Sequence, residues 1–165
     1  MEMLKTNFPQ IKRDYLETLQ INIGYKCNQA CSHCHVDASP SRTEMMSDKI
    51  IDLIPKVIKT NKIKLLDITG GAPELHPKFK QLVKEVRSLN VEVMDRCNLT
   101  IITEPGHEEL ANFLASNKVQ ITASLPCYLK ENVDKQRGKG VFEKSISALK
   151  ILNSYGYGIA GKGLI

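Results

Sequence analysis

The segment from residue 25 to residue 37, YKCNQACSHCHVD, carries three cysteines and two histidines within thirteen residues. Thiolate and imidazole side chains at this density are typical of a metal centre. A structural zinc site takes four ligands, and His33 or His35 could complete such a set. Structural zinc sites usually draw their ligands from two separated pairs, however, and the sequence holds no second pair.

The three cysteines of this segment, Cys27, Cys31 and Cys34, form a C-x₃-C-x₂-C pattern. Cys31 and Cys34 alone would make a redox C-x-x-C pair, which would leave Cys27 without a role. An iron–sulfur cluster would use all three thiolates. Because a cubane cluster normally takes four cysteines, one iron would then stay open to a substrate or cofactor. The residue types therefore favour a cluster over zinc, and the rest of the chain must decide between them.

Short apolar strands alternate with amphipathic helices along the chain, and each chemically unusual segment follows a strand. The pattern predicts four strands, at 19–25, 64–71, 91–94 and 119–125. It predicts four helices, at 47–60 with Pro55 as a kink, 77–89, 106–115 and 141–153. This alternation implies a parallel sheet, in which ligands bind at the carboxyl ends of the strands. The cysteine loop, GGAPE, DRCN and SLPCY should therefore meet at one edge of the sheet.

These four βα units predict an α/β fold, a partial (βα) barrel that stays open, because a complete (βα)₈ barrel needs about 250 residues. We expect an N-terminal extension at 1–18, the barrel core at 19–158 and a tail at 159–165 that indicates a truncation. The fourth strand would then be an unpaired edge. The connection at 126–140 is long for a barrel loop, which favours a functional role.

Three motifs at matching strand ends resemble the radical S-adenosylmethionine (SAM) superfamily. The cysteine pattern follows the first strand, and GGAPE at 70–74 is similar to the family's GGEP segment. Ser124, with RG at 137–138 and VFE at 141–143, is similar to a stretch that contacts SAM in many members. The resemblance spans about residues 19 to 157 and implies a partial barrel of the radical SAM type.

By that resemblance, Cys27, Cys31 and Cys34 hold three irons of a 4Fe–4S cluster, and the fourth iron takes the amino and carboxylate groups of SAM. His33 would stack against the adenine, unless it is an ordinary surface histidine, and His35 has no assigned role. The reduced cluster would give one electron to the SAM sulfonium and yield a 5′-deoxyadenosyl radical, with the protein orienting and shielding it. The electron would come from a donor such as flavodoxin or ferredoxin.

The same resemblance supplies the remaining SAM contacts. It assigns the SAM ammonium to main-chain groups of four consecutive residues, Gly70, Gly71, Ala72 and Pro73. Glycines suit this role because they let the backbone approach closely. Ser124 and Arg137 would bind the SAM carboxylate, with Arg137 as a fixed cation that has a forked set of donors. The alternative for Arg137 is a solvated loop charge.

Two further cysteines, Cys97 in DRCNLT and Cys127 in SLPCY, also follow strands. Either could be a small buried side chain instead of a functional one. Their surroundings resemble the arsenosugar-biosynthesis radical SAM proteins, which are thought to attach the deoxyadenosyl group to a methylated trivalent arsenic. Because soft thiolates prefer soft centres, we predict that Cys97 and Cys127 hold the arsenical. Members of that group continue into further strands, so this chain alone is expected to bind a cluster weakly and not to turn over.

Composition narrows the possible partners. The net charge of +5 comes from basic residues spread along the chain, and Trp is absent, so we expect no nucleic-acid partner. No long apolar run or signal peptide is present, which predicts a cytoplasmic protein without a membrane span. Five reduced cysteines fit that compartment. The alternative function is a non-catalytic iron–sulfur or zinc binding module.

Overall fold

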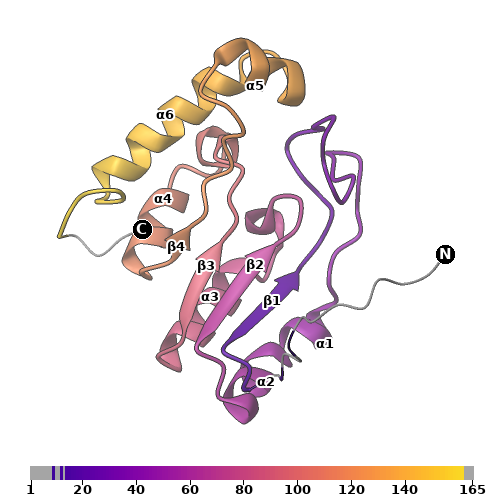
Figure 1. Cartoon of the computed structure of the whole chain (residues 1–165), viewed down its shortest axis with the longest axis vertical. Helices are drawn as coiled ribbons and strands as arrows, with labels where there is room; N and C mark the ends of the chain where they lie inside the picture. Colours follow the sequence, from indigo (N-terminus) through magenta and orange to yellow (C-terminus); the bar gives the residue numbers. More distant parts are fainter. Residues whose placement is uncertain (1–8, 10–11, 13, 162–165) are drawn as a thin grey trace.

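Four parallel strands lie side by side in the order in which they occur in the chain. The computed structural model describes residues 9, 12 and 14–161. The strands are β1 (Thr18–Asn22), β2 (Leu65–Thr69), β3 (Glu92–Asp95) and β4 (Gln120–Ile121). They pair in parallel in the order β1-β2-β3-β4, so neighbours in sequence are neighbours in the sheet (Figure 1).

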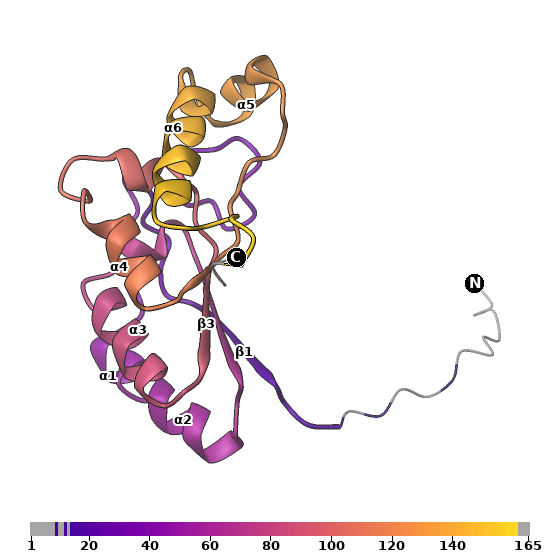
Figure 2. The ribbon, with the colours of Figure 1, turned by 90° about the vertical axis from the view of Figure 1, so that its left-hand side faces the viewer.

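Within the described residues, each strand is followed by at least one α-helix. The helices are α1 (Asp48–Ile51), α2 (Ile54–Asn61), α3 (Phe79–Ser88), α4 (Leu110–Ser116), α5 (Lys130–Arg137) and α6 (Val141–Ser154), with two short 3₁₀ helices, η1 (Pro73–Leu75) and η2 (Thr100–Thr103). Helices α1 to α4 cover one face of the sheet (Figure 2). This arrangement confirms the predicted open α/β fold with four βα units.

The core lies between the sheet and the helices on that face. Leu66 and Ile68 of β2 and Val93 of β3 are fully buried in one apolar cluster with the inner side of α3. Burying each such side chain stabilises the fold by about 1.5–3 kcal/mol. The core therefore fixes the strands, and through them the loops that leave their carboxyl ends.

The predicted helix at 47–60 is divided in two. The first helix ends at Ile51, and Pro55 lies in the first turn of α2, where proline needs no N–H partner. The predicted kink is thus a break between two helices. A continuous helix would place Ile50 and Val57 on its apolar face, but the two residues are 49% and 42% exposed.

The fourth unit differs most from the prediction. The strand expected at 119–125 is only two residues long, and the short length suits an edge strand, which has a partner on one side only. The connection at 126–140, predicted as a loop, contains the helix α5. Asp134 stabilises this arrangement, because its carboxylate accepts N–H bonds of 3.0 Å from Gly140 and Phe142 at the start of α6.

Other boundaries shift by a few residues. The predicted helix at 106–115 begins later, at Leu110. Leu89, the last residue of the helix predicted at 77–89, lies just past α3 and is 37% exposed. Most of the predicted N-terminal extension and the end of the predicted tail lie outside the described residues. Of the helices in the described part of the chain, none combines the length and the apolar character needed to cross a bilayer.

Candidate functional site

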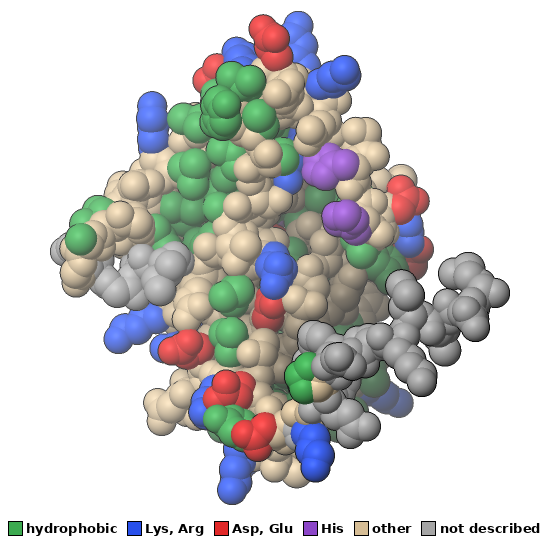
Figure 3. All heavy atoms as spheres, in the orientation of Figure 1, with side chains coloured by type: hydrophobic (Ala, Val, Ile, Leu, Met, Phe, Trp, Pro, Cys, Tyr) green, Lys and Arg blue, Asp and Glu red, His purple; other side chains and the backbone are tan. Residues whose placement is uncertain are grey.

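A cavity of about 520 Å³ opens at the carboxyl ends of the strands. Its lining includes most of the residues that the sequence singled out, namely Cys27, Cys31, Cys34, His33, His35, Gly70, Gly71, Ser124 and Arg137. The loop after β1 and the helix α5 stand at this same end of the sheet (Figure 1). His33 and His35 are exposed, and Figure 3 shows histidine side chains at the surface of this face. The predicted meeting of the motifs at one edge is thus present in the fold.

Two of the three sulfur atoms of the cysteine loop accept hydrogen bonds from N–H donors, whereas Cys31 Sγ donates to Gln29 Oε1 at 3.5 Å. Cys27 is buried, and its Sγ accepts bonds from Gln29 N at 3.4 Å and from the Asn98 side chain at 3.2 Å. The Sγ of Cys34, half-buried, accepts from Ala38 N at 3.2 Å. Hydrogen bonds to sulfur stabilise the negative charge of a thiolate or a cluster ligand. The surroundings of these thiols therefore fit an iron–sulfur cluster.

Burial sets the protonation of two of these thiols. It raises the pKa of Cys27 and that of Cys31, and in Cys31 the Arg137 guanidinium acts in the opposite direction. Without a metal both thiols therefore hold their protons at neutral pH. Metal binding needs the thiolates, so loading this site releases protons and depends on pH.

The glycine pair after β2 packs directly against the cysteine loop. Gly71 N donates to Gly24 O, and Ala72 N donates to Lys26 O, each at 2.9 Å. A Cβ added at Gly71 would lie 2.4 Å from Lys26 O, too close for any side chain. The pair therefore holds the loop beside the sheet, which explains the need for glycine there.

The predicted SAM-ammonium segment is only partly at the cavity. Gly70 and Gly71 line it, whereas Ala72 and Pro73 are buried and lie outside its lining. The N–H groups of Gly71 and Ala72 are already bonded to the cysteine loop. An ammonium is a donor, so carbonyl oxygens of the segment would be its partners.

Arg137 lies on the opposite wall and is 9% exposed. Its guanidinium donates to Ser124 O at 2.7 Å and to the Ser124 hydroxyl. Within the described residues its Nε has no hydrogen-bond partner, and no carboxylate forms a salt bridge with it. A buried cation without a paired anion is costly, and an anionic ligand in the cavity would offset that cost.

Arg96 and Asn98 are among the lining residues of the cavity that sequence reasoning did not single out. Arg96 forms a forked pair with Asp67 of β2, with N–O distances of 2.8 and 2.7 Å, which lowers the pKa of Asp67. A usable signal was present: side chains alternate between faces along an extended segment. If Cys97 points to one face, its two neighbours in DRCN point to the other.

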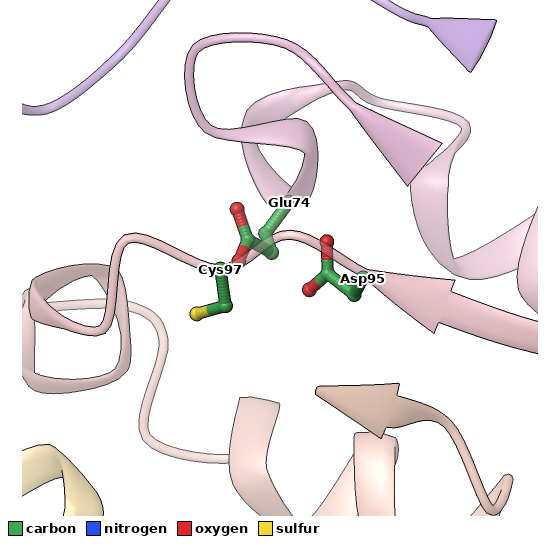
Figure 4. A group of neighbouring side chains, drawn as sticks. All are labelled: Glu74, Asp95 and Cys97. Atoms are coloured by element: carbon green, nitrogen blue, oxygen red, sulfur yellow. The ribbon is translucent and has the colours of Figure 1, made fainter. Parts of the chain in front are cut away.

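Cys97 and Cys127 do not share the cavity. Cys97 is fully buried and lies beside Glu74 and Asp95 (Figure 4). Cys127 is half-buried at the start of the connection to α5, and neither sulfur belongs to the lining of the cavity. Hydrogen bonds from the Asn132 side chain and from Leu129 N lower the pKa of Cys127. The structure therefore does not bring these two thiols together.

Comparison with known proteins matches the sequence of this chain to one family. The family model described as the radical SAM superfamily matches residues 21–164. The chain is 31% identical to the mycofactocin maturase MftC of Mycolicibacterium smegmatis, over 81% of this chain and 33% of that protein. It is 26% identical to the antilisterial bacteriocin subtilosin biosynthesis protein AlbA of Bacillus subtilis, over 80% of this chain and 29% of AlbA. The chain thus spans about a third of the length of these relatives.

A solved structure has the same fold. The crystal structure of Streptococcus suis SuiB bound to S-adenosylmethionine superposes with a TM-score of 0.70 and 18% sequence identity. The match covers 86% of this chain and 32% of SuiB. At this identity the likeness establishes the fold alone.

Proposed function

The chain belongs to the radical SAM superfamily, whose cofactors are a 4Fe–4S cluster and SAM, and from this we propose that it forms the cluster- and SAM-binding part of a radical SAM enzyme. One observation carries the proposal. The three loop cysteines, the glycine pair and Arg137 come from three different βα units and line a single cavity of about 520 Å³. A structural zinc site would require neither the glycine pair nor Arg137.

In this proposal Cys27, Cys31 and Cys34 ligate three irons of the cluster. The N–H donors on Cys27 and Cys34 support the negative charge that the ligated sulfurs carry. Gly71 keeps the loop against the sheet, and the three cysteines all belong to the lining of the cavity. Three thiolates leave one cluster iron without a cysteine ligand, which is the place for SAM.

Arg137 and Ser124 bind the SAM carboxylate from the opposite wall. The Ser124 contacts hold the guanidinium in place, and the unpaired Nε adds a donor. Carbonyl groups at Gly70 and Gly71 accept from the SAM ammonium, and His33, exposed at the rim, stacks on the adenine. A reduced cluster held by these residues would supply the one electron that is needed to cleave SAM into methionine and a 5′-deoxyadenosyl radical. The walls orient SAM and keep water from the reacting bond.

Of the two cysteines that were predicted to hold the arsenical, only Cys127 has support. Transfer of the deoxyadenosyl group to a methylated trivalent arsenical stays a prediction, as does the closeness to arsenosugar-biosynthesis proteins. Cys127 supports it, because this half-buried thiol has a lowered pKa and directly follows Pro126, which lines the cavity. Cys97 is fully buried and gives it no support. A flavodoxin or ferredoxin is the electron donor we propose.

Anaerobic reconstitution with iron and sulfide tests the proposal. The measurements are iron per chain, cluster absorption and methionine released from SAM. We expect the wild-type chain to bind iron and SAM weakly and to release no methionine by turnover. Cys31→Ala should lose most of the iron, and Cys127→Ala, the matched control, should keep it. Bound zinc with no cluster absorption would instead favour the zinc-binding module.

The arsenical prediction needs its own measurement, made on a full-length homologue. Cys127→Ser should weaken arsenite binding and slow deoxyadenosyl transfer, whereas SAM binding should be unchanged. Equal arsenite affinity in the wild-type and variant proteins would contradict the arsenical assignment and leave the radical SAM assignment intact.

A further inference from the structure

Three buried side chains with metal-ligand chemistry meet on the helix side of the sheet, outside the cavity. They are Glu74 on η1, Asp95 at the end of β3, and Cys97 two residues later. One ligand atom from each lies within 4.8 Å of the other two (Figure 4). Asp95 and Cys97 are completely inaccessible to solvent, and Glu74 is 9% exposed.

The carboxylate groups of this cluster lack hydrogen-bond and ion-pair partners in the described residues. Within the described residues, none of the four carboxylate oxygens of Glu74 and Asp95 has a hydrogen-bond partner. No Lys, Arg or His of the described residues forms a salt bridge with either group. Burying carboxylate oxygens without partners is costly, because the charged form loses its hydration and gains nothing in return. The site therefore needs a proton or a cation to neutralise it.

Local structure gives the three groups their positions. Asp95 and Cys97 are two residues apart on an extended segment, so both point to the same face of the sheet. Glu74 reaches that face because it follows the tight Gly-Gly-Ala-Pro turn. The end of β3 and the helix η1 therefore bring the three side chains to one place.

We propose that Glu74, Asp95 and Cys97 bind one divalent cation of the zinc type. The mixed donor set selects the metal, because thiolates suit zinc and similar ions, whereas magnesium and calcium take oxygen ligands. A divalent ion would partner carboxylate oxygens that are otherwise unsatisfied. Burial raises the pKa of Asp95 and of Cys97, so binding would displace protons and strengthen as pH rises.

The test must separate this site from the loop thiols. A full-length variant with Cys27→Ala, Cys31→Ala and Cys34→Ala is stripped with a chelator and titrated with zinc and with cobalt. We expect one equivalent of zinc, and a thiolate-to-cobalt absorption band. Adding Cys97→Ser should abolish the band, and Asp95→Asn should weaken zinc binding by more than about tenfold. Cys127→Ser is the matched control and should change neither.

Two results would overturn the proposal. One is no zinc bound by a background variant that circular dichroism shows to be folded. The other is zinc binding unchanged by both Cys97→Ser and Asp95→Asn. If the background variant does not fold, the wild-type chain loaded with iron is compared with its Asp95→Asn form. Equal zinc content in the two would then overturn the site. The outcome does not depend on SAM cleavage.

Discussion

The side-chain amide of Asn98 donates a hydrogen bond of 3.2 Å to Sγ of Cys27, 71 residues earlier in the chain. Asn98 is held in place through its own oxygen, which accepts from Ile101 N at 3.2 Å and from the Thr100 hydroxyl at 3.3 Å. A second bond from its amide, 2.8 Å long, goes to the Asn28 side chain. The donor is therefore fixed before any cluster is loaded.

This donor should tune the cluster. Reduction adds negative charge, and an N–H bond to a ligand sulfur stabilises the more negative state. Asn98→Leu should therefore shift the cluster midpoint potential to a more negative value, measured by redox titration followed by electron paramagnetic resonance. Asn112→Ala, on the exposed side of α4, is the control. An unchanged potential with equal iron content would show that Asn98 has only a structural role.

Arg137 should be needed as arginine and not merely as a cation. Arg137→Lys keeps the charge but loses the forked donors, each of which is worth about 1.5–3 kcal/mol to a charged partner. SAM affinity, measured by calorimetry on the reconstituted chain, should fall by about tenfold to a hundredfold. Lys135→Met, an exposed change on the same helix, should leave it unaltered. Equal affinity for Arg137→Lys would remove Arg137 from the carboxylate site.

Gly71→Ala should destabilise the fold, since the added carbon would lie 2.4 Å from Lys26 O. Overpacking of this kind costs about 1–3 kcal/mol, visible in urea unfolding. Iron content after reconstitution should also fall, because the cysteine loop is displaced. Gly106→Ala is the comparison, since nothing lies within 4 Å of its added carbon and only the strain at φ +84° remains. A larger loss at Gly106 would contradict the packing argument.

The Arg96–Asp67 pair should stabilise the protein at neutral pH and lose its effect in acid. The Arg96 hydrogen bonds lower the pKa of Asp67 in the folded state below its unfolded value of about 3.9. A lowered pKa adds stability above the unfolded value, which is lost as pH falls through the folded value. Asp67→Asn should therefore flatten the acid side of the stability curve measured by urea unfolding. Asp37→Asn, a change at a side chain that is 98% exposed, should not.

Thiol alkylation should separate the two cysteines that lie outside the cavity lining. Cys127 is half-buried with a lowered pKa, so iodoacetamide should modify it readily at slightly alkaline pH. Cys97 is fully buried with a raised pKa and should react only after unfolding. Mass spectrometry of the digested chain measures the labelling rate of each cysteine. Comparable labelling of the two in the folded protein would contradict the burial of Cys97.

The position of the site was predictable because one rule governs it. Parallel strands bring their carboxyl ends to one edge, so cysteines after the first strand and glycines after the second had to become neighbours. The two-residue period of the strands and the 3.6-residue period of the helices were sufficient to place both the cysteines and the glycines. Family resemblance added Arg137, whose spacing alone carries no signal.

The parts that could not be predicted depend on tertiary contacts. Helix α5 buries only Val133 and Arg137, so its sequence has almost no apolar periodicity from which a helix could be predicted. Its stability comes from Asp134, bonded to the start of α6, and from Arg137, bonded to Ser124. The unpaired edge at the fourth strand was predicted, but the shortening of that strand to two residues was not, because its length depends on pairing in the sheet. Asn98 could be found only through the alternation of side chains next to Cys97, because an amide has no metal-ligand spacing of its own.

The contact between Ser32 and Gln136 has a consequence for how the protein is made. Ser32 N donates to Gln136 O at 3.0 Å, and the two residues are 104 positions apart. Synthesis proceeds from the N-terminus at about 5–20 residues per second. The cysteine loop therefore leaves the ribosome several seconds before the wall that closes over it. During that interval the loop lacks its contact with Gln136, so the cavity takes its final form only after α5 has been made.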